Sequence, residues 1–357
     1  MSKRVVVGLS GGVDSSVAAL LLKQQGYQVI GLFMRNWHET DDNGFCTAEE
    51  DFRDVRRVAD VLDIPYYAID FSREYYDRVF AHFVEEYGKG RTPNPDVLCN
   101  REIKFEAFAR YAKSFGADYI ATGHYAKVET REDGLPHLML SADDDKDQTY
   151  FLNQVRTEQL TNVLFPLSDI SDKGEVRRLA EEYGLPTAAK KDSTGICFIG
   201  ERNFRNFLSQ YIPMKEGDIK TLDGKVVGRH EGVYYYTIGQ RKGLGVGGGG
   251  NGEPYFVIDK DVKDNILWVN QGECDLLYTD RLVVDDFNFI PTPLPDGEYR
   301  VTCRIRHRQP LQAATAIVRG PSVEVIFDQK QRGVALGQYA VLYRDRDCLG
   351  GGVIEHK

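Results

Sequence analysis

The chain has 357 residues, 42% of them hydrophobic, which is enough apolar surface for two or three globular domains. No apolar run approaches the roughly 18 residues of a membrane-spanning helix, and residues 1–9 are too short for a signal peptide, so a cytoplasmic location is expected. The net charge of −9 argues against a protein that binds nucleic acid over its whole surface, although a local basic patch remains compatible with it.

The first predicted element is a buried strand over residues 4–9, because this short stretch is rich in valine and bounded by glycine. Apolar spacing typical of a helix follows over 17–25. Between them lies the hexad Ser10-Gly11-Gly12-Val13-Asp14-Ser15, whose glycines let backbone N–H groups approach an anion at the start of a helix. A carboxylate beside phosphates requires a divalent cation between them, so Asp14 implies Mg²⁺.

A glycine turn that serves only the packing of strand on helix is the simplest alternative, but the complete hexad disfavours it. The hexad lacks the Gly-Lys-Ser/Thr of a Walker loop and the spaced glycines of a dinucleotide fingerprint. A kinase, a GTPase or a dehydrogenase is therefore disfavoured. The sequence predicts a loop that binds the phosphates of a nucleotide.

Strand and helix patterns alternate along the first part of the chain and predict an α/β fold with a parallel sheet. Further strands are expected over 28–34, 66–71 and 118–123, and further helices over 48–62 and 102–115. Met34 and the pair Gly123-His124 stand at the ends of two strands, where open α/β sheets usually bind their ligands. Either could line an adenine pocket, although a methionine at a strand end is more often part of the core.

The pattern changes after residue 200. From 201 to about 277, a short helix and Tyr, Val and Ile alternations around a glycine-rich run predict a small separate unit. From 281 to the end, short strands recur with turn signals and predict a small β-barrel. The expected domains are therefore 1–200, 201–277 and 278–357.

Four arginines of the last domain alternate with other residues: Arg300, Arg304, Arg306 and Arg308. On one strand they would share a face. Such a face suits a phosphate backbone, and the alternative is a solvated barrel exterior.

The six cysteines lack the spacing of a zinc site, so structural metal is not expected, and each thiol is expected to be buried unless its neighbours indicate chemistry. Cys99 follows two prolines in an expected extended loop, so its thiol should lie near a helix N-terminus, with Arg101 and Lys104 favouring the thiolate. Asp96 could move a proton, or could equally be an N-cap or turn residue. Cys197 lies in a loop with two lysines upstream, and spacing alone does not say whether the two cysteines meet.

Seven motifs occur in order along essentially the whole chain, over residues 8–15, 90–96, 98–100, 121–125, 146–148, 192–202 and 239–245. On these motifs the chain resembles the bacterial tRNA-specific 2-thiouridylases. The resemblance implies a pyrophosphate-loop ATP-binding domain, a small central domain and a C-terminal β-barrel. It also implies an activity: ATP-dependent adenylation of the C2 oxygen of the wobble uridine in tRNA, then sulfur transfer from a cysteine persulfide, with release of AMP and pyrophosphate.

The resemblance also assigns roles to particular residues. Those implied to bind ATP are Gly8, Leu9, Ser10, Gly11, Gly12, Val13, Asp14, Ser15, Met34 and Gly123. Cys197 is implied to carry the incoming sulfur as a persulfide, and Cys99 to be the second catalytic thiol. Those implied to contact tRNA are Asn94, Pro95, Asp96, His124, Lys146, Asp147, Gln148, Arg306, His307 and Gln338. The family often has tyrosine at the position of His307. The implied partners are the tRNA anticodon loop and a sulfur donor protein, either a cysteine desulfurase or a relay protein, and the implied cofactors are ATP and Mg²⁺.

The chemistry explains why these parts belong together. The uracil C2 oxygen is a poor leaving group, so it must first be joined to AMP. The persulfide on Cys197 then attacks C2 directly, or Cys99 releases its outer sulfur as sulfide, and the two thiols end as a disulfide that must be reduced. A second hypothesis is an ATP-dependent amidotransferase or ligase with the same loop, which needs no paired cysteines. A third is a tRNA-binding or nucleotide-sensing module without turnover.

Overall fold

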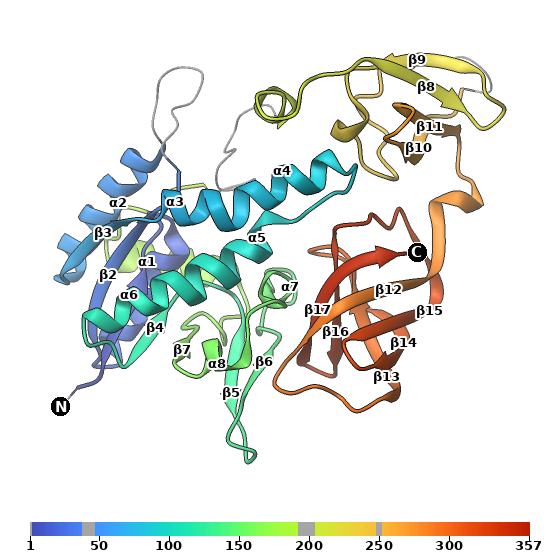
Figure 1. Cartoon of the computed structure of the whole chain (residues 1–357). Helices are drawn as coiled ribbons and strands as arrows, with labels where there is room; N and C mark the ends of the chain where they lie inside the picture. Colours follow the sequence, from blue (N-terminus) through green and yellow to red (C-terminus); the bar gives the residue numbers. More distant parts are fainter. Residues whose placement is uncertain (1, 38–46, 192–203, 248–251) are drawn as a thin grey trace.

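The computed structural model describes residues 2–37, 47–191, 204–247 and 252–357 (Figure 1). Among these residues, the N-terminal part is built around a parallel sheet of five strands in the order β3-β2-β1-β4-β7. The strands are β1 (Arg4–Gly8), β2 (Gln28–Arg35), β3 (Tyr66–Asp70), β4 (Tyr119–Ala121) and β7 (Val163–Leu164). The predicted parallel sheet is confirmed, and its strands all end at the same edge.

Helices cover both faces of this sheet. Successive side chains of β1 point to opposite faces and therefore enter two different hydrophobic cores. Val5 and Val7 pack in one core with α1 (Val13–Gln24), α2 (Thr47–Leu62) and α9 (Lys173–Glu182). Val6 packs in the other core with two helical segments. The first segment comprises α3 (Ser72–Tyr75), η1 (Tyr76–Phe80) and α4 (Ala81–Gly88), and the second comprises α5 (Pro95–Leu98), η2 (Cys99–Phe108) and α6 (Ala109–Ser114).

Two predicted helices begin earlier than their apolar spacing indicates. The first, α1, starts at Val13 rather than at residue 17. The second starts at Pro95 rather than at residue 102. Proline suits the first position of a helix, and the Asn94 side chain caps this one by accepting a hydrogen bond from the Asp96 N–H at 3.2 Å. The predicted extended loop is therefore wrong from Pro95 onward, whereas residues 91–94 do lie outside regular structure.

A small β-domain follows, in agreement with the separate unit that the sequence predicts. Among the described residues it holds a four-stranded sheet in the order β10-β11-β8-β9. Its elements are α10 (Phe204–Leu208), β8 (Gly217–Thr221), β9 (Val226–His230), η3 (Val233–Tyr235), β10 (Tyr255–Asp261), β11 (Ile266–Gln271) and η4 (Asp275–Leu277).

The predicted β-barrel is also confirmed. Six antiparallel strands of the described segment 252–357 close on themselves, because β12 pairs with both β15 and β17. The strands are β12 (Tyr278–Phe289), β13 (Gly297–Arg304), β14 (Gln312–Arg319), β15 (Ser322–Arg332), β16 (Tyr339–Arg344) and β17 (Asp347–His356). A hairpin from the N-terminal part, β5 (Lys127–Thr130) and β6 (Pro136–Met139), joins the barrel sheet where Met139 pairs with Asp347.

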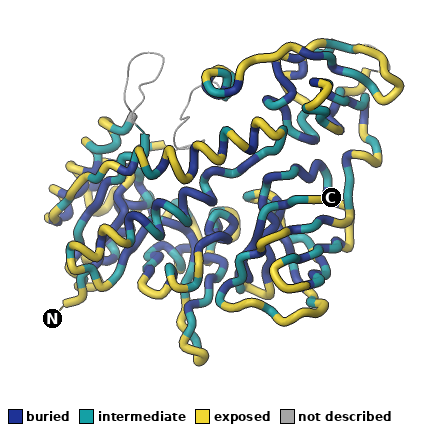
Figure 2. The backbone as a smooth tube through the Cα atoms, in the orientation of Figure 1, coloured by how far each residue is buried: buried dark blue, intermediate teal, exposed yellow. Residues whose placement is uncertain are grey.

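One hydrophobic core runs through all three parts, and it contains Phe83, Val233 and Tyr339 among many others. Figure 2 shows buried residues in both the α/β part and the barrel where the two parts face each other. The short helices α7 (Thr149–Leu152) and α8 (Thr157–Leu160) lie at this contact. None of the helices in the described part of the chain is long and apolar enough to cross a membrane.

A buried ion pair also ties the barrel to the N-terminal part. Arg304 is 5% exposed, and its Nη1 lies 3.1 Å from Oδ1 of Asp147, which is 1% exposed. The strand β13 ends at Arg304, and Arg300 forms an exposed ion pair with Asp328. The predicted face of four arginines is therefore wrong, because a segment from the N-terminal part covers the strand.

Replacement of Arg304 by alanine is expected to lower the free energy of unfolding by about 3–5 kcal/mol, because the Asp147 carboxylate would stay buried without its cation. Urea denaturation followed by circular dichroism measures the loss. Arg300→Ala is the matched control and should change the midpoint little, since its pair is exposed to solvent. Equal losses in the two variants would contradict the structural importance of the buried pair.

Candidate active site

The phosphate loop connects β1 to α1, and serine hydroxyl groups hold its shape. The Ser15 hydroxyl accepts a hydrogen bond from the Ser10 N–H at 3.1 Å and lies 3.1 Å from the Gly12 carbonyl, to which it donates. The Ser16 hydroxyl donates to the same carbonyl at 2.8 Å. A helix leaves the N–H groups of its first turn unpaired internally, so α1 offers these donors and the positive end of its dipole to an anion.

Two glycines let this loop pack against neighbouring backbone. A Cβ atom on Gly123 would lie 2.7 Å from the nitrogen of Ser15 and 2.8 Å from the carbonyl carbon of Asp14. A Cβ atom on Gly11 would lie 2.6 Å from the backbone oxygen of Asp51 in α2, and Gly11 has a φ of +80°. Only glycine fits at either position without moving the loop.

Gly8 and Met34 lie side by side near the ends of β1 and β2. The Met34 methyl carbon is 3.4 Å, and the Phe108 ring 3.7 Å, from the point where a Cβ atom on Gly8 would stand. Leu9 is buried, and its N–H donates to the Leu32 carbonyl at 2.9 Å, so Leu9 supports the loop from the core. The structure thus gathers the residues implied to bind ATP at one edge of the sheet.

The segment that follows β4 links the phosphate loop to the helix that carries Cys99. The Tyr125 hydroxyl donates to Oδ1 of Asp14 at 2.9 Å. One residue earlier, Nε2 of His124 lies 3.4 Å from Nζ of Lys104, which belongs to the same helical segment as Cys99. A single short segment therefore contacts both the loop and the thiol-bearing helix.

The helical segment starts at Pro95, so Cys99, predicted to lie near a helix N-terminus, is in its second turn, and its side chain is only 1% exposed. Asp96 precedes it by three residues, so the two project from neighbouring positions of the helix. Burial raises the pKa of the Asp96 carboxyl, and the positive charge of Lys104 acts in the opposite direction. Burial and Lys104 together hold the pKa of His124 well below its ordinary value, so this imidazole is neutral at pH 7.

For the 2-thiouridylase activity that the resemblance implies, replacement of Asp96 by asparagine is expected to slow thiolation about 100-fold or more while tRNA affinity changes little, because the amide cannot take part in proton transfer. The raised pKa means that the folded chain holds the Asp96 proton more tightly than the unfolded chain does. Wild-type stability therefore falls as pH rises from the ordinary value of 3.8 towards the raised pKa, and then stays level. Ionisation of the buried carboxyl destabilises the folded wild type, and asparagine has no group that ionises. The variant should therefore be at least as stable as the wild type at pH 7.

Single-turnover thiolation, tRNA binding and the unfolding midpoint, each measured for the wild type and for Asp96→Asn, check these expectations. Equal losses of binding and of thiolation would make Asp96 a residue that positions the RNA instead.

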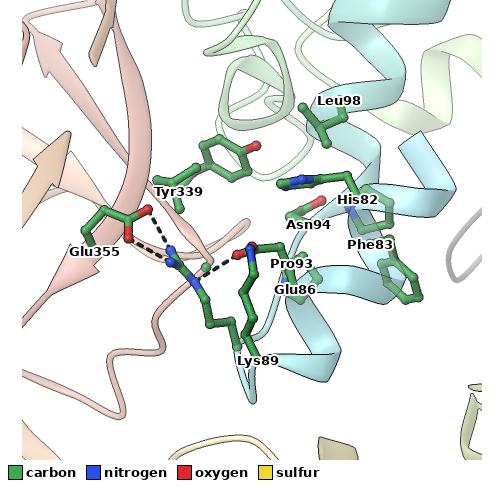
Figure 3. Close-up of a pocket in the computed structure, with 13 residues that line it drawn as sticks. His82, Phe83, Glu86, Lys89, Pro93, Asn94, Leu98, Tyr339 and Glu355 are labelled. Atoms are coloured by element: carbon green, nitrogen blue, oxygen red, sulfur yellow. Dashed lines mark hydrogen bonds and ion pairs between the residues drawn. The ribbon is translucent and has the colours of Figure 1, made fainter. Parts of the chain in front are cut away.

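A cavity of about 250 Å³ lies between α4, the segment before α5 and the barrel (Figure 3). Asn94 and Pro95 line it from the N-terminal part, and Glu355 lines it from the barrel. Arg91 crosses this contact, with its guanidinium group 2.8 Å from the Glu86 carboxylate and 2.7 Å from that of Glu355. Two of the residues implied to contact tRNA therefore open onto a hollow that both domains form.

Gln338 lies at the same contact. Its Nε2 donates to the Thr92 carbonyl at 2.7 Å, and its Oε1 accepts from the Tyr150 hydroxyl at 3.3 Å. The Gln338 side chain therefore fixes the backbone just before Asn94 to the barrel.

The segment 146–148 contacts other parts of the site. The Gln148 side chain accepts a hydrogen bond from the Tyr125 N–H at 3.0 Å, and its backbone N–H donates to the Tyr125 carbonyl at 2.8 Å. Asp147 accepts from the Ser141 N–H and the Thr149 hydroxyl in addition to Arg304. A direct contact between Asp147 and tRNA is thus not available in this structure, because the carboxylate is enclosed by these partners.

Arg306 and His307 line an open groove of about 430 Å³ on the barrel, together with Arg308 and Lys330. The His307 ring lies 4.5 Å from the ring of Phe151, and burial lowers the pKa of His307 to about 4. The imidazole is therefore neutral at pH 7, and the positive charge of this groove comes from its arginine and lysine side chains.

Cys197, implied to carry the persulfide, lies outside the described residues. The chain leads into its segment from Lys190, whose ammonium group pairs with Asp51 at 2.8 Å and Asp54 at 2.6 Å. Since the backbone of Asp51 packs against Gly11, Lys190 is held close to the phosphate loop.

The sequence pattern does not indicate the roles of two lysines of the site. Lys104, expected to favour the Cys99 thiolate, also approaches His124. The ammonium group of Lys173 contacts Asp14, which lies 159 positions earlier in the chain. No local pattern marks such a pair, because only the packing of α9 on α1 brings the two residues together.

The fold and the site define a class of protein: a nucleotide-binding α/β domain, with its phosphate loop after the first strand, joined to two β-domains. The three parts match, in order, family models described as tRNA methyl transferase HUP domain (residues 3–201), tRNA methyl transferase PRC-barrel domain (residues 205–271) and aminomethyltransferase β-barrel domain (residues 279–354).

The chain belongs to the family of the tRNA-specific 2-thiouridylases. It is 57% identical over 354 residues to the tRNA-specific 2-thiouridylase of Geobacillus kaustophilus, with 99% of this chain and 94% of the relative covered. It is 55% identical over 355 residues to that of Streptococcus agalactiae, with 99% and 95% covered. Among solved structures, a 4-thiouridine synthetase bound to RNA and ATP aligns with 59% of this chain and 50% of its own at 16% identity, with a TM-score of 0.36.

Proposed function

We propose that this chain is a tRNA-specific 2-thiouridylase, which adenylates the C2 oxygen of the wobble uridine and then replaces that oxygen by sulfur. Its close relatives carry this name over nearly their full length. The single observation that carries the proposal is the segment after β4, which contacts Asp14 through Tyr125 and the thiol-bearing helix through His124. Activation and sulfur transfer both require access to one base, and this segment connects the two groups of residues that would perform them.

The first step uses the phosphate loop. The uracil O2 attacks the α-phosphorus of ATP, the new O–P bond replaces the bond to the β-phosphate, and pyrophosphate leaves with the electron pair. The loop N–H groups and the dipole of α1 are suited to holding the phosphates. The donor set also fits Mg²⁺, which binds proteins through one or two carboxylates and completes its shell with phosphate oxygens and water. Asp14 would supply that carboxylate, and the ion would neutralise phosphate charge.

The second step uses the two thiols. In the direct route the outer sulfur of the Cys197 persulfide bonds to C2 and AMP leaves with the former O2 oxygen. The Cys99 thiolate then attacks the inner sulfur, the S–S bond breaks and its electron pair stays on the sulfur bound to C2. In the other route the Cys99 thiolate first releases the outer sulfur as sulfide, which bonds to C2 as AMP leaves, and in both routes Cys99 and Cys197 finish as a disulfide. A dithiol reductant must then restore the thiols before the next turnover. Asp96, three residues from Cys99, is the group proposed to move a proton.

The proposed RNA surface comprises the cavity at Asn94 and Pro95, the half-buried residues Lys146 and Gln148, and the barrel groove at Arg306. Gln338, which joins two of these regions, and neutral His124 complete it. The overall charge of −9 confines attraction for phosphate to such local sites. We place the enzyme in the cytoplasm with its tRNA, and we assign the sulfur supply to a cysteine desulfurase or a relay protein.

The test is to incubate the purified protein with ATP, Mg²⁺ and sulfide, with and without unmodified tRNA, and to measure both AMP and 2-thiouridine by mass spectrometry. AMP and thiolated tRNA together are the expected result. AMP formed equally well without tRNA would favour a ligase or amidotransferase, and ATP binding with no AMP would favour a nucleotide-sensing module.

Two of the matching family models are described as tRNA methyl transferase domains, so the assay must also distinguish methylation of the tRNA from sulfur replacement. Sulfur replacement and methylation change the mass of the nucleoside by different amounts, so high-resolution detection separates them. With S-adenosylmethionine added to the same assay, a methylated nucleoside with no sulfur incorporated would overturn the proposal. We expect sulfur, because a loop suited to ATP phosphates serves to activate an oxygen for displacement, a step that methyl transfer does not need.

A further inference from the structure

The carboxylate of Asp14 has a cation as its closest partner. Nζ of Lys173 lies 2.6 Å from both carboxylate oxygens. The Tyr125 hydroxyl donates to one of the same oxygens at 2.9 Å, and the Lys173 ammonium lies 5.5 Å from the centre of the Tyr125 ring. The Lys173 side chain is only 14% exposed, so this is a partly enclosed ion pair at the phosphate loop and not a contact of two surface side chains.

The fold determines where Lys173 stands. It is the first residue of α9, and Asp172 caps this helix by accepting a hydrogen bond from the Gly174 N–H at 2.8 Å. Val176 and Ala180 of α9 pack in the same core as α1. The packing of α9 on α1 therefore presents the lysine at the start of α1.

This placement is unfavourable for a lysine unless an anion is nearby. A positive charge at the N-terminus of a helix opposes the helix dipole, and Lys173 is close to the N-termini of both α9 and α1. Asp172 caps α9 and Asp14 pairs with the lysine, whereas the N–H groups in the first turn of α1 have no partner within their helix. A group with several negative charges suits such a place better than a single carboxylate does.

We propose that Lys173 is a phosphate-binding residue of the nucleotide site, which neutralises Asp14 before ATP binds and contacts the pyrophosphate portion of ATP afterwards. The proposal rests on the ATP site of the proposed function and adds a residue to it. As O2 bonds to the α-phosphorus, the bond to the β-phosphate breaks and its electrons remain on the pyrophosphate. The ammonium group of Lys173 stabilises this added charge without giving up its proton.

The test measures the binding of ATP, pyrophosphate and AMP to the full chain by isothermal titration calorimetry in the presence of Mg²⁺ and without RNA. For Lys173→Met, the Kd for ATP and for pyrophosphate is expected to rise about 10- to 100-fold, the effect of losing one charge-assisted hydrogen bond. The Kd for AMP should change less than about threefold, because AMP lacks the phosphates that Lys173 would contact. Lys173→Arg keeps the charge and should retain most of the affinity for ATP.

Lys127→Met is the matched control, because Lys127 also pairs with an aspartate, Asp169, but at an exposed position. It should leave all three affinities unchanged, and the unfolding midpoint of each variant reports whether it folds. Equal weakening of ATP and AMP in Lys173→Met would make the lysine a purely structural partner of Asp14, and unchanged affinities would remove it from the site. Either outcome overturns the proposal, and neither depends on thiolation. If ATP did not bind even to the wild type, both the role of Lys173 and the proposed function would fail.

Discussion

Serine in place of Cys99 or of Cys197 is expected to abolish 2-thiouridine formation, with a loss of about 1,000-fold or more, while tRNA-dependent AMP release continues. A hydroxyl group cannot carry a persulfide and cannot close a disulfide, so sulfur transfer stops in either variant. Adenylation should persist, because the groups expected to bind ATP lie at the end of the sheet and include neither thiol. Parallel measurement of AMP and of thiolated nucleoside separates the two steps.

Cys274→Ser is the matched control, because this thiol is only partly buried and lies in the central domain, so it should leave both readouts unchanged. Cys99 is 1% exposed, and its replacement requires a check of the unfolding midpoint. Thiolation that survives the loss of either Cys99 or Cys197 would show that sulfur does not pass through that residue.

Replacement of Gly123 by alanine is expected to weaken ATP binding at least about 100-fold. The added Cβ atom would lie 2.7 Å from the nitrogen of Ser15 and 2.8 Å from the carbonyl carbon of Asp14, so the first turn of α1 must move. Displacement of two N–H donors from the phosphates costs roughly two charge-assisted hydrogen bonds, which accounts for the expected loss. The Kd for ATP, measured by calorimetry, checks this value.

Gly88→Ala is the matched control for this substitution. Gly88 lies in α4, and a Cβ atom there would meet nothing within 4 Å. The control should bind ATP like the wild type and should be slightly more stable, since alanine favours a helix over glycine. ATP affinity that is unchanged in Gly123→Ala would mean that the close packing of this glycine on α1 does not shape the nucleotide site.

The elements of the fold with a strong local pattern were predictable. The valine-rich stretch of β1, the apolar spacing of α1 and α2 and the short strands of the barrel all have periodicities that local physics explains. Apolar spacing does not predict the start of the helix at Pro95, because the apolar pattern begins later in the chain. The helix start depends instead on Pro95 itself and on the Asn94 cap. Helix boundaries follow such single residues more than periodicity.

Long-range contacts were not predictable in the same way. The sequence pattern places Arg304 on a strand beside other arginines, but nothing in the local pattern says that Asp147 will cover it. The pairing of the hairpin β5–β6 with the barrel sheet was equally unpredictable, because strand pairing across domains depends on how the two parts dock. Burial of Cys99 under its neighbours also follows from packing, and not from the spacing of Asp96 and Cys99 in the chain.

The sequence by itself determined the parallel sheet, the phosphate loop with its glycines, the barrel, and the order of the motifs that indicate a family, since all of these are written in residues close together along the chain. Only the tertiary structure decided which charged groups meet. It paired Lys173 with Asp14, brought Lys104 to His124, and enclosed Asp147 with Arg304. The physical reason is that an ion pair between distant residues requires helices and strands to pack first, and this packing depends on the whole core.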